Sequence, residues 1–167
     1  MTTSRIMLIT ALVLGSGCAL LSGGARKTQM EKATVSPRPD PATIMTMPAV
    51  TTPEGGMYRL VKLDDKEACI NGEMPGTATT IKRYTFLLSS YASPDEKPTD
   101  VPSTVSSEPQ VLGTYTAGQS MVQLQVCFAK PTVISEKTKY LVLEADPGGL
   151  LGSPSYAVWH FNDAVRM

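Results

Sequence analysis

The stretch Met121-Val122-Gln123-Leu124-Gln125-Val126-Cys127-Phe128-Ala129 decides the fold of this chain. Its apolar and polar side chains alternate with a period of two, so the four even-numbered residues share one face of an extended strand. The opposite face carries Gln123, Gln125 and Cys127. This alternation is typical of an antiparallel strand with one face buried. It predicts a β-strand over 121–129 with Cys127 on the polar side.

Further runs of strand character stand on both sides of this stretch. They cover 58–63, 79–90, 111–116, 139–145 and 156–161, and clusters of Gly and Pro separate them. No segment in this part of the chain has helical period and length. The pattern predicts an all-β fold, an antiparallel β-sandwich of six to eight short strands over residues 57–167. The stretch 93–110 is predicted to be a long loop, with a short edge strand around 101–105.

The chain before residue 57 has a different composition. All ten aromatic residues lie between Tyr58 and Phe161, and residues 22–56 instead contain five prolines. Such a segment cannot bury enough apolar surface to offset its ordering entropy. We therefore predict a flexible Pro/Thr-rich tether over 18–56, with a coil length of about 34 Å. The small apolar island Ile44-Met45-Thr46-Met47 is either disordered, docked on this domain or a partner, or a weak Cu(I) site.

The first eighteen residues have the pattern of an export signal. Arg5 precedes a nine-residue apolar run, 6–14, which is too short to span a bilayer and fits a cleaved signal peptide. The run closes with Gly15-Ser16-Gly17-Cys18, which resembles the lipobox of bacterial lipoproteins, although Gly15 replaces the Leu-like residue preferred there. The alternative is an ordinary secretory signal in which Cys18 is incidental.

The lipobox resemblance implies a location and an anchor. Residues 1–17 would be the signal peptide, and Cys18 would be the mature N-terminus carrying palmitate and other acyl chains. A residue other than Asp after the cysteine, here Ala19, is typical of outer-membrane sorting in that family. We therefore expect a lipid-anchored protein of the outer membrane whose domain faces the periplasm.

Two cysteines remain once Cys18 is assigned to lipid. Cys69 and Cys127 then form an even pair in an oxidising compartment, so we predict a disulfide between them. Closing a loop of about 58 residues would stabilise the domain by roughly 4 kcal/mol in the chain-entropy description. Two buried free thiols are the alternative.

The charge balance excludes some classes of partner. From Met57 onward there are 10 basic and 12 acidic residues, without a basic stripe. This argues against nucleic acid as a partner and against electrostatic docking on anionic lipid. Membrane contact is therefore expected only through the lipid on Cys18.

No catalytic or metal-binding constellation stands out. His160 is the only histidine, and no Gly-x-Ser-x-Gly elbow accompanies it. One histidine and two separated cysteines do not make a four-ligand zinc set. Asp64, Asp65 and Glu67 have the pattern of a solvated acidic turn. We expect no enzyme activity, no cofactor and no metal.

The remaining features favour binding. Leu150 and Leu151 stand at the tip of a Pro-Gly-Gly turn, where they either fold back on the core or offer an apolar contact. We predict that they bind a partner. The alternative is a sandwich that binds carbohydrate or another small molecule on an aromatic platform of Tyr91, Tyr115 or Trp159.

A second resemblance points to the kind of assembly. The run Ser135-Glu136-Lys137-Thr138-Lys139-Tyr140-Leu141-Val142-Leu143, followed later by a Trp, is similar to the late strands of TssJ, the outer-membrane lipoprotein of type VI secretion. That family also places a lipidated cysteine before a small β-sandwich. The resemblance implies a non-catalytic structural or accessory subunit of a larger envelope complex, such as a secretion apparatus.

Overall fold

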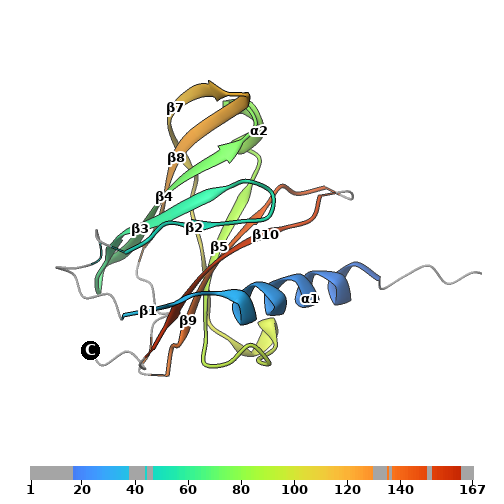
Figure 1. The fold of residues 1–167 in the computed structure, drawn as a ribbon, viewed down its shortest axis with the longest axis vertical. Coiled ribbons are helices and arrows are strands. Elements are labelled where there is room, and N and C mark those ends of the chain that lie inside the picture. The colour runs from blue at the N-terminus through green and yellow to red at the C-terminus, as the bar shows by residue number, and fades with distance from the viewer. Residues whose placement is uncertain are drawn as a thin grey trace, which may run out of the picture.

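A computed structural model describes residues 17–37, 44, 47–129, 135, 137–149 and 152–162, with the side chains of 17–22 and of Thr99 left aside. The described chain forms a sandwich of two five-stranded sheets, shown in Figure 1. The prediction of an all-β antiparallel sandwich is confirmed. Among the described residues, eight strands begin at or after residue 57, and two short ones precede it.

The first sheet has the strand order β1-β10-β9-β5-β6. Its strands are β1 (Val35–Ser36), β10 (Ser155–Phe161), β9 (Tyr140–Asp146), β5 (Thr85–Tyr91) and β6 (Ser103–Val105). All neighbours are antiparallel except β1 and β10, which run parallel. The edge strand expected around 101–105 is confirmed as β6.

The second sheet has the order β2-β3-β4-β8-β7 and is antiparallel throughout. Its strands are β2 (Val50–Thr51), β3 (Met57–Leu63), β4 (Glu67–Pro75), β8 (Gln119–Ala129) and β7 (Gln110–Ala117). In β8 the four even-numbered apolar residues 122–128 are fully buried, whereas Gln123 is exposed and Cys127 partly exposed. The predicted faces of this strand are therefore confirmed.

Two parts of the strand prediction are wrong. The run 79–90 was expected to be one strand, but 78–81 form a short helix, α2 (Ala78–Ile81), and β5 begins at Thr85. The Thr77 hydroxyl accepts a hydrogen bond from the Thr80 amide and caps α2, which turns the chain before Ile81 enters the core. The central strand β4 was not predicted at all.

The main core lies between the two sheets. It includes Leu60, Ile70, Phe86, Leu124 and Phe128, all fully buried. Ile44 and Met47 belong to the same core, so the described part of the apolar island docks on this protein's own domain.

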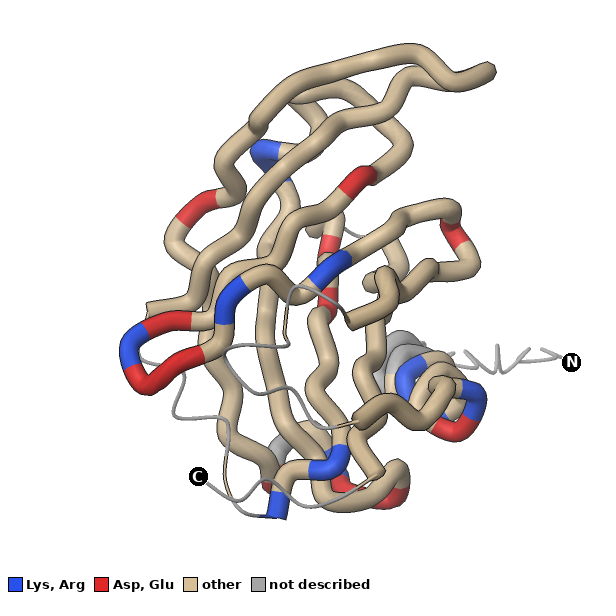
Figure 2. Tube along the Cα trace, turned by 60° about the vertical axis from the view of Figure 1, so that its left-hand side comes forward, with Lys and Arg blue, Asp and Glu red and all other residues tan. Residues whose placement is uncertain are grey.

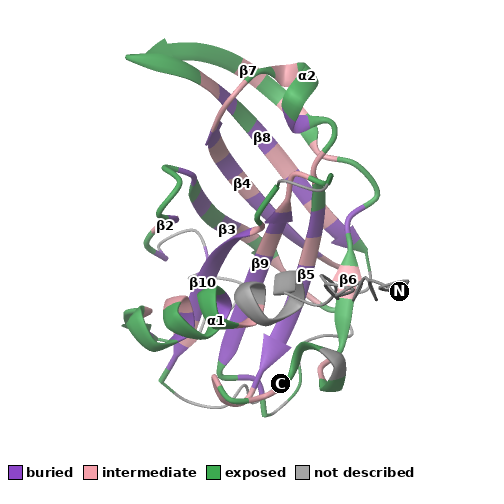
Figure 3. Cartoon of the chain, turned by 90° about the vertical axis from the view of Figure 1, so that its right-hand side faces the viewer, coloured by how far each residue is buried: buried purple, intermediate pink, exposed green. Residues whose placement is uncertain are grey.

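The segment expected to be a tether is structured where it is described. The helix α1 (Gly17–Lys32) lies on the outer face of the first sheet, as Figures 1 and 3 show. Beneath it is a second cluster of buried residues: Met30, Tyr91, Tyr140, Val142, Tyr156 and Val158. Because both faces of β9 and β10 are covered, these two strands are apolar along most of their length. The expectation of a tether throughout 18–56 is therefore wrong for α1, β1 and β2.

Candidate functional site

Cys18, the predicted lipidation site, lies in the first turn of α1. Arg26 and Met30 then fix this helix to the first sheet. The Arg26 guanidinium lies 4.6 Å from the centre of the Tyr91 ring, and its Nη1 donates to the Tyr91 hydroxyl at 2.9 Å. Its Nη2 donates to the Glu96 carbonyl at 2.9 Å. These contacts hold the chain behind Cys18 on the sandwich.

A second contact joins α1 to the long loop 93–110. The Lys27 ammonium lies 2.5 Å from the Asp95 carboxylate, and this exposed pair raises the pKa of Lys27. The sequence predicted this stretch as a long loop with one short edge strand. In the structure α1 contacts its first part, and β6 pairs its later part with β5.

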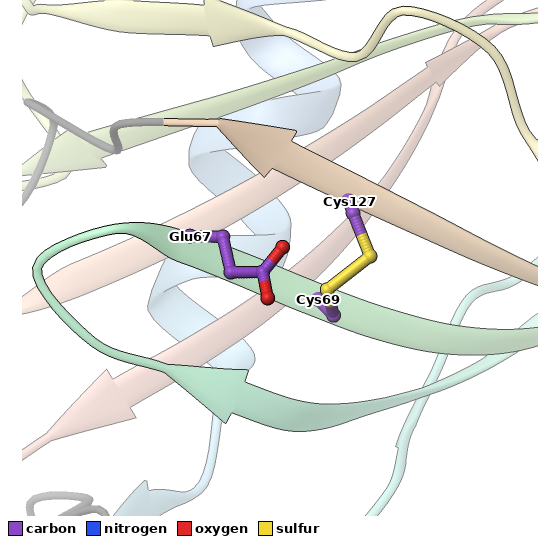
Figure 4. Close-up of side chains that lie close together, drawn as sticks. All are labelled: Glu67, Cys69 and Cys127. Carbon is purple, nitrogen blue, oxygen red and sulfur yellow. A yellow bond between two sulfur atoms is a disulfide. The ribbon is translucent and has the colours of Figure 1, made fainter.

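Cys69 and Cys127 are joined by a disulfide, as predicted. The two residues stand directly opposite each other on β4 and β8, with Cα atoms 4.2 Å apart. Figure 4 shows Glu67 on the same face beside them, and the three form the one group of metal-ligand side chains among the described residues. The disulfide removes the thiolates that a zinc site requires. The Glu67 carboxylate pairs with the Lys62 ammonium.

The acidic turn between β3 and β4 is a structural turn. The Asp64 carboxylate accepts hydrogen bonds from the Glu67 and Lys66 amides, both at 2.8 Å. These two bonds hold the pKa of Asp64 below its usual value. Asp64 therefore closes the hairpin as an Asx-type acceptor.

His160, the only histidine, stacks on Tyr140 of the neighbouring strand, with ring centres 4.2 Å apart. Tyr91 and Trp159 are buried and offer no outward aromatic platform of the kind the alternative hypothesis requires, whereas Tyr115 is 38% exposed. Leu150 and Leu151 lie outside the described residues, and their role in partner binding stays a prediction.

The structure places Trp159 beside a groove that the sequence did not indicate. This groove has a volume of about 300 Å³ and lies between the end of α1, β2 and β10. Trp159 and Val158 line it, together with Lys32 and Thr34. The buried Nε1 of Trp159 has no hydrogen-bond partner among the described residues.

The outer face of the second sheet carries a row of polar side chains. Tyr115 donates to one Glu73 oxygen at 2.8 Å, and Gln123 donates to the other at 3.2 Å. The bond to Glu73 raises the pKa of Tyr115. Two residues further along the same two strands, β8 and β4, Gln125 donates to Asn71 at 2.9 Å. The row holds β4, β8 and β7 side by side on the solvent face.

The β7–β8 hairpin is the most prominent surface feature. Figures 1 and 3 show it projecting past the rest of the sandwich, with exposed residues on both strands near its turn. Leu112 is 53% exposed there, close to a groove of about 260 Å³ that also borders Met57 on β3. Sequence periodicity identified both strands, but could not show that their ends leave the core.

No family model matches this sequence, and no curated protein or solved structure is similar to it. Within the described residues, no helix has the length and apolar character needed to cross a membrane.

Proposed function

We propose that this protein is a lipid-anchored envelope lipoprotein and a non-catalytic structural subunit of a larger envelope complex, such as a secretion apparatus. The observation that carries the proposal is the position of α1. Within the described residues this helix includes the predicted lipidation site, Cys18, and packs on the sandwich through Arg26 and Met30. An anchor followed at once by a docked helix suits a subunit that holds its domain in one orientation.

The docked helix also sets a distance. From Cys18 to Arg26 is eight residues, or about 12 Å of helix. A domain fixed so close to its acyl chains meets partners near the outer membrane, facing the periplasm. The surface charges of the described residues are scattered over the sandwich, as Figure 2 shows, which agrees with recognition by shape and hydrogen bonding.

Acyl labelling tests the anchor. Cells fed an alkyne fatty acid should yield a labelled wild-type protein in the outer-membrane fraction and an unlabelled Cys18→Ser variant. Thr79→Ser is the control, because this conservative change at an exposed position leaves Cys18 in place and should keep the label. Equal labelling of wild type and Cys18→Ser would contradict the proposal.

Affinity capture tests the subunit role. The tagged wild-type chain, solubilised from membranes, should recover a defined set of envelope proteins. Leu150→Ser with Leu151→Ser should weaken this recovery if the predicted tip contact is correct. Recovery of no envelope protein in wild type would argue against a subunit of a complex.

A second candidate function is small-molecule binding, favoured by the groove beside Trp159. A small polar ligand held in that groove would lie beside Trp159 and near the Lys32 and Thr34 side chains that also line it. Screening sugars and other small polar molecules for changes in Trp159 fluorescence tests this candidate. A hit that loses affinity in Lys32→Ala, and keeps it in the exposed Glu108→Ala control, would support it.

A further inference from the structure

The four edges of the two sheets differ in how they are protected. The edge strands β1 and β2 have two residues each, and β6 has three. Proline follows β1 at Pro37, flanks β2 at Pro48 and Pro53, and precedes β6 at Pro102. Short strands and prolines are the devices that keep a sheet edge from pairing with another chain.

The β7 edge carries these devices only at its start, where Pro109 precedes the strand and an irregularity lies between Val111 and Gly113. The strand has eight residues, and its part from Gly113 to Ala117 contains no proline. From Pro109 to Ala129 there is no charged residue. In Figure 2 this hairpin is the long uncharged part at the top of the tube. Its edge is therefore open to strand addition along 113–117.

The far part of the hairpin also has little core beneath it. All residues from Thr114 to Ser120 are exposed, on both faces of the two strands. A two-stranded ribbon that extends past its sheet is only marginally stable in water. A further strand on the β7 edge would supply the missing neighbour.

The register shows which backbone groups face outward. The short Cα separation of Cys69 and Cys127 marks a non-hydrogen-bonded pair of the β4–β8 ladder. Alternation along β8 then directs the backbone groups of Gln123 and Met121 to their β7 partners, Gly113 and Tyr115. The N–H and C=O groups of Thr114 and Thr116 are left at the open edge.

We propose that β7 pairs antiparallel with β7 of a second copy of this chain. Thr114 of one copy faces Thr116 of the other, and each such pair exchanges two hydrogen bonds. A two-fold axis then passes between the two Tyr115 residues, which form a non-hydrogen-bonded pair with their rings on the outer face. The two five-stranded sheets join into one.

A second copy fits this edge better than a charged segment of another protein. The edge offers no counter-charge to such a segment, whereas two neutral edges meet without repulsion. The edge also complements itself, since the spacing of Thr114 and Thr116 about Tyr115 is symmetric. The pairing does not depend on lipid at Cys18.

Cysteine cross-linking tests the two-fold axis. The Tyr115→Cys variant of the full exported chain is purified in mild detergent and oxidised. It should form a covalent dimer on a non-reducing gel, because two directly opposed residues of a non-hydrogen-bonded pair lie within disulfide distance. Cys69 and Cys127 form such a pair. Gln119→Cys is the control. It is equally exposed in the same hairpin, yet lies more than about 12 Å from its copy in the proposed pair. Equal cross-linking of both variants, or none, would overturn the proposal.

Analytical ultracentrifugation of proteins purified in the same way tests whether the β7 edge forms the dimer. Wild type should have twice the mass of one chain. Thr114→Pro and Thr116→Lys should raise the dimer dissociation constant about tenfold or more, by removing outward hydrogen bonds or adding charge at the edge. Thr79→Lys, the same change on exposed α2, should leave it unchanged.

Circular dichroism should show that both edge variants keep the wild-type fold, since neither removes a bond of the β7–β8 ladder. A monomeric wild type, or a dimer that both edge variants leave intact, would overturn the proposal.

Discussion

Gly72 stands in the middle of β4, where its missing side chain makes room for Tyr58. A Cβ atom at this position would lie 2.9 Å from Cδ1 of the Tyr58 ring and 3.3 Å from Leu124. Both neighbours are buried, so neither can move aside freely. The glycine allows a large aromatic residue to pack flat against the central strand.

Gly72→Ala should destabilise the domain by about 2 kcal/mol, because the added methyl group overpacks the core. Gly113→Ala is the control in the same sheet. Its Cβ would meet only the Gln123 side-chain oxygen, at 3.6 Å, so its effect should stay within about 0.5 kcal/mol. Urea unfolding of both variants measures the difference. Equal stability of the two would show that the Tyr58 ring yields.

Glu144 is a partly buried acid whose charge opposes folding. Burial raises its pKa, and the neighbouring Asp146 carboxylate raises it further. Because the pKa of Glu144 is higher in the folded state, protonated Glu144 contributes to the free energy of unfolding. This contribution is complete below pH 4.5, the usual pKa, and is lost as the pH rises through the folded-state pKa.

Glu144→Gln should therefore raise the melting temperature by about 2 °C near pH 7 and give no gain near pH 4. Thermal melts at the two pH values measure this. Glu108→Gln, an exposed change of the same kind, should shift neither melt. A gain of equal size at both pH values would mean that lost charge is not the cause.

Among the elements, α1 depends most on its tertiary contacts. It contains Gly23 and Gly24 in its interior, and each glycine costs a helix about 1 kcal/mol relative to alanine. Its stability must come from packing, which Arg26 and Met30 supply. This explains why the sequence predicted a tether here: the helix signal is weak, and the contacts that form it lie about 65 residues away in sequence.

Arg26→Ala should release α1 from the sandwich and cost about 2 kcal/mol, because it removes a buried cation–π contact and two hydrogen bonds. Lys27→Ala, one residue on, removes only an exposed ion pair and should cost less than about 1 kcal/mol. Hydrogen exchange of residues 23–32 measures both effects. Protection that persists in Arg26→Ala would show that Met30 alone holds the helix.

The strands illustrate which signals a sequence carries. β8 was predicted to within two residues, with the correct buried face, because one face meets the core and the other meets water. β4 was missed, since Gly72 and Pro75 read as turn residues although one packs under Tyr58 and the other ends the strand. The disulfide followed from the pairing of two cysteines. The open β7 edge could not be predicted from the sequence, because the order of strands depends on how the whole sheet assembles.

At the scale of the whole molecule, the first sheet is the middle one of three layers, between α1 and the second sheet. Sheet-to-sheet packing covers the inner side of β10 at Trp159, and α1 covers the other side at Tyr156 and Val158. Loss of either layer exposes the apolar face of the same strand. The helix and the sandwich should therefore unfold as one cooperative unit.

Trp159 makes this testable, because it is the only tryptophan and is 2% exposed in the main core. Urea unfolding followed by Trp159 fluorescence should coincide with the loss of helix followed by far-ultraviolet circular dichroism. In Arg26→Ala the helix signal should move to lower urea and separate from the fluorescence transition, because its packing is weakened while the inter-sheet core is unchanged. Two separate transitions in the wild type would mean that α1 is only loosely attached. The domain would then stand at a variable distance from Cys18, and the proposal of a rigidly oriented envelope subunit would lose its main support.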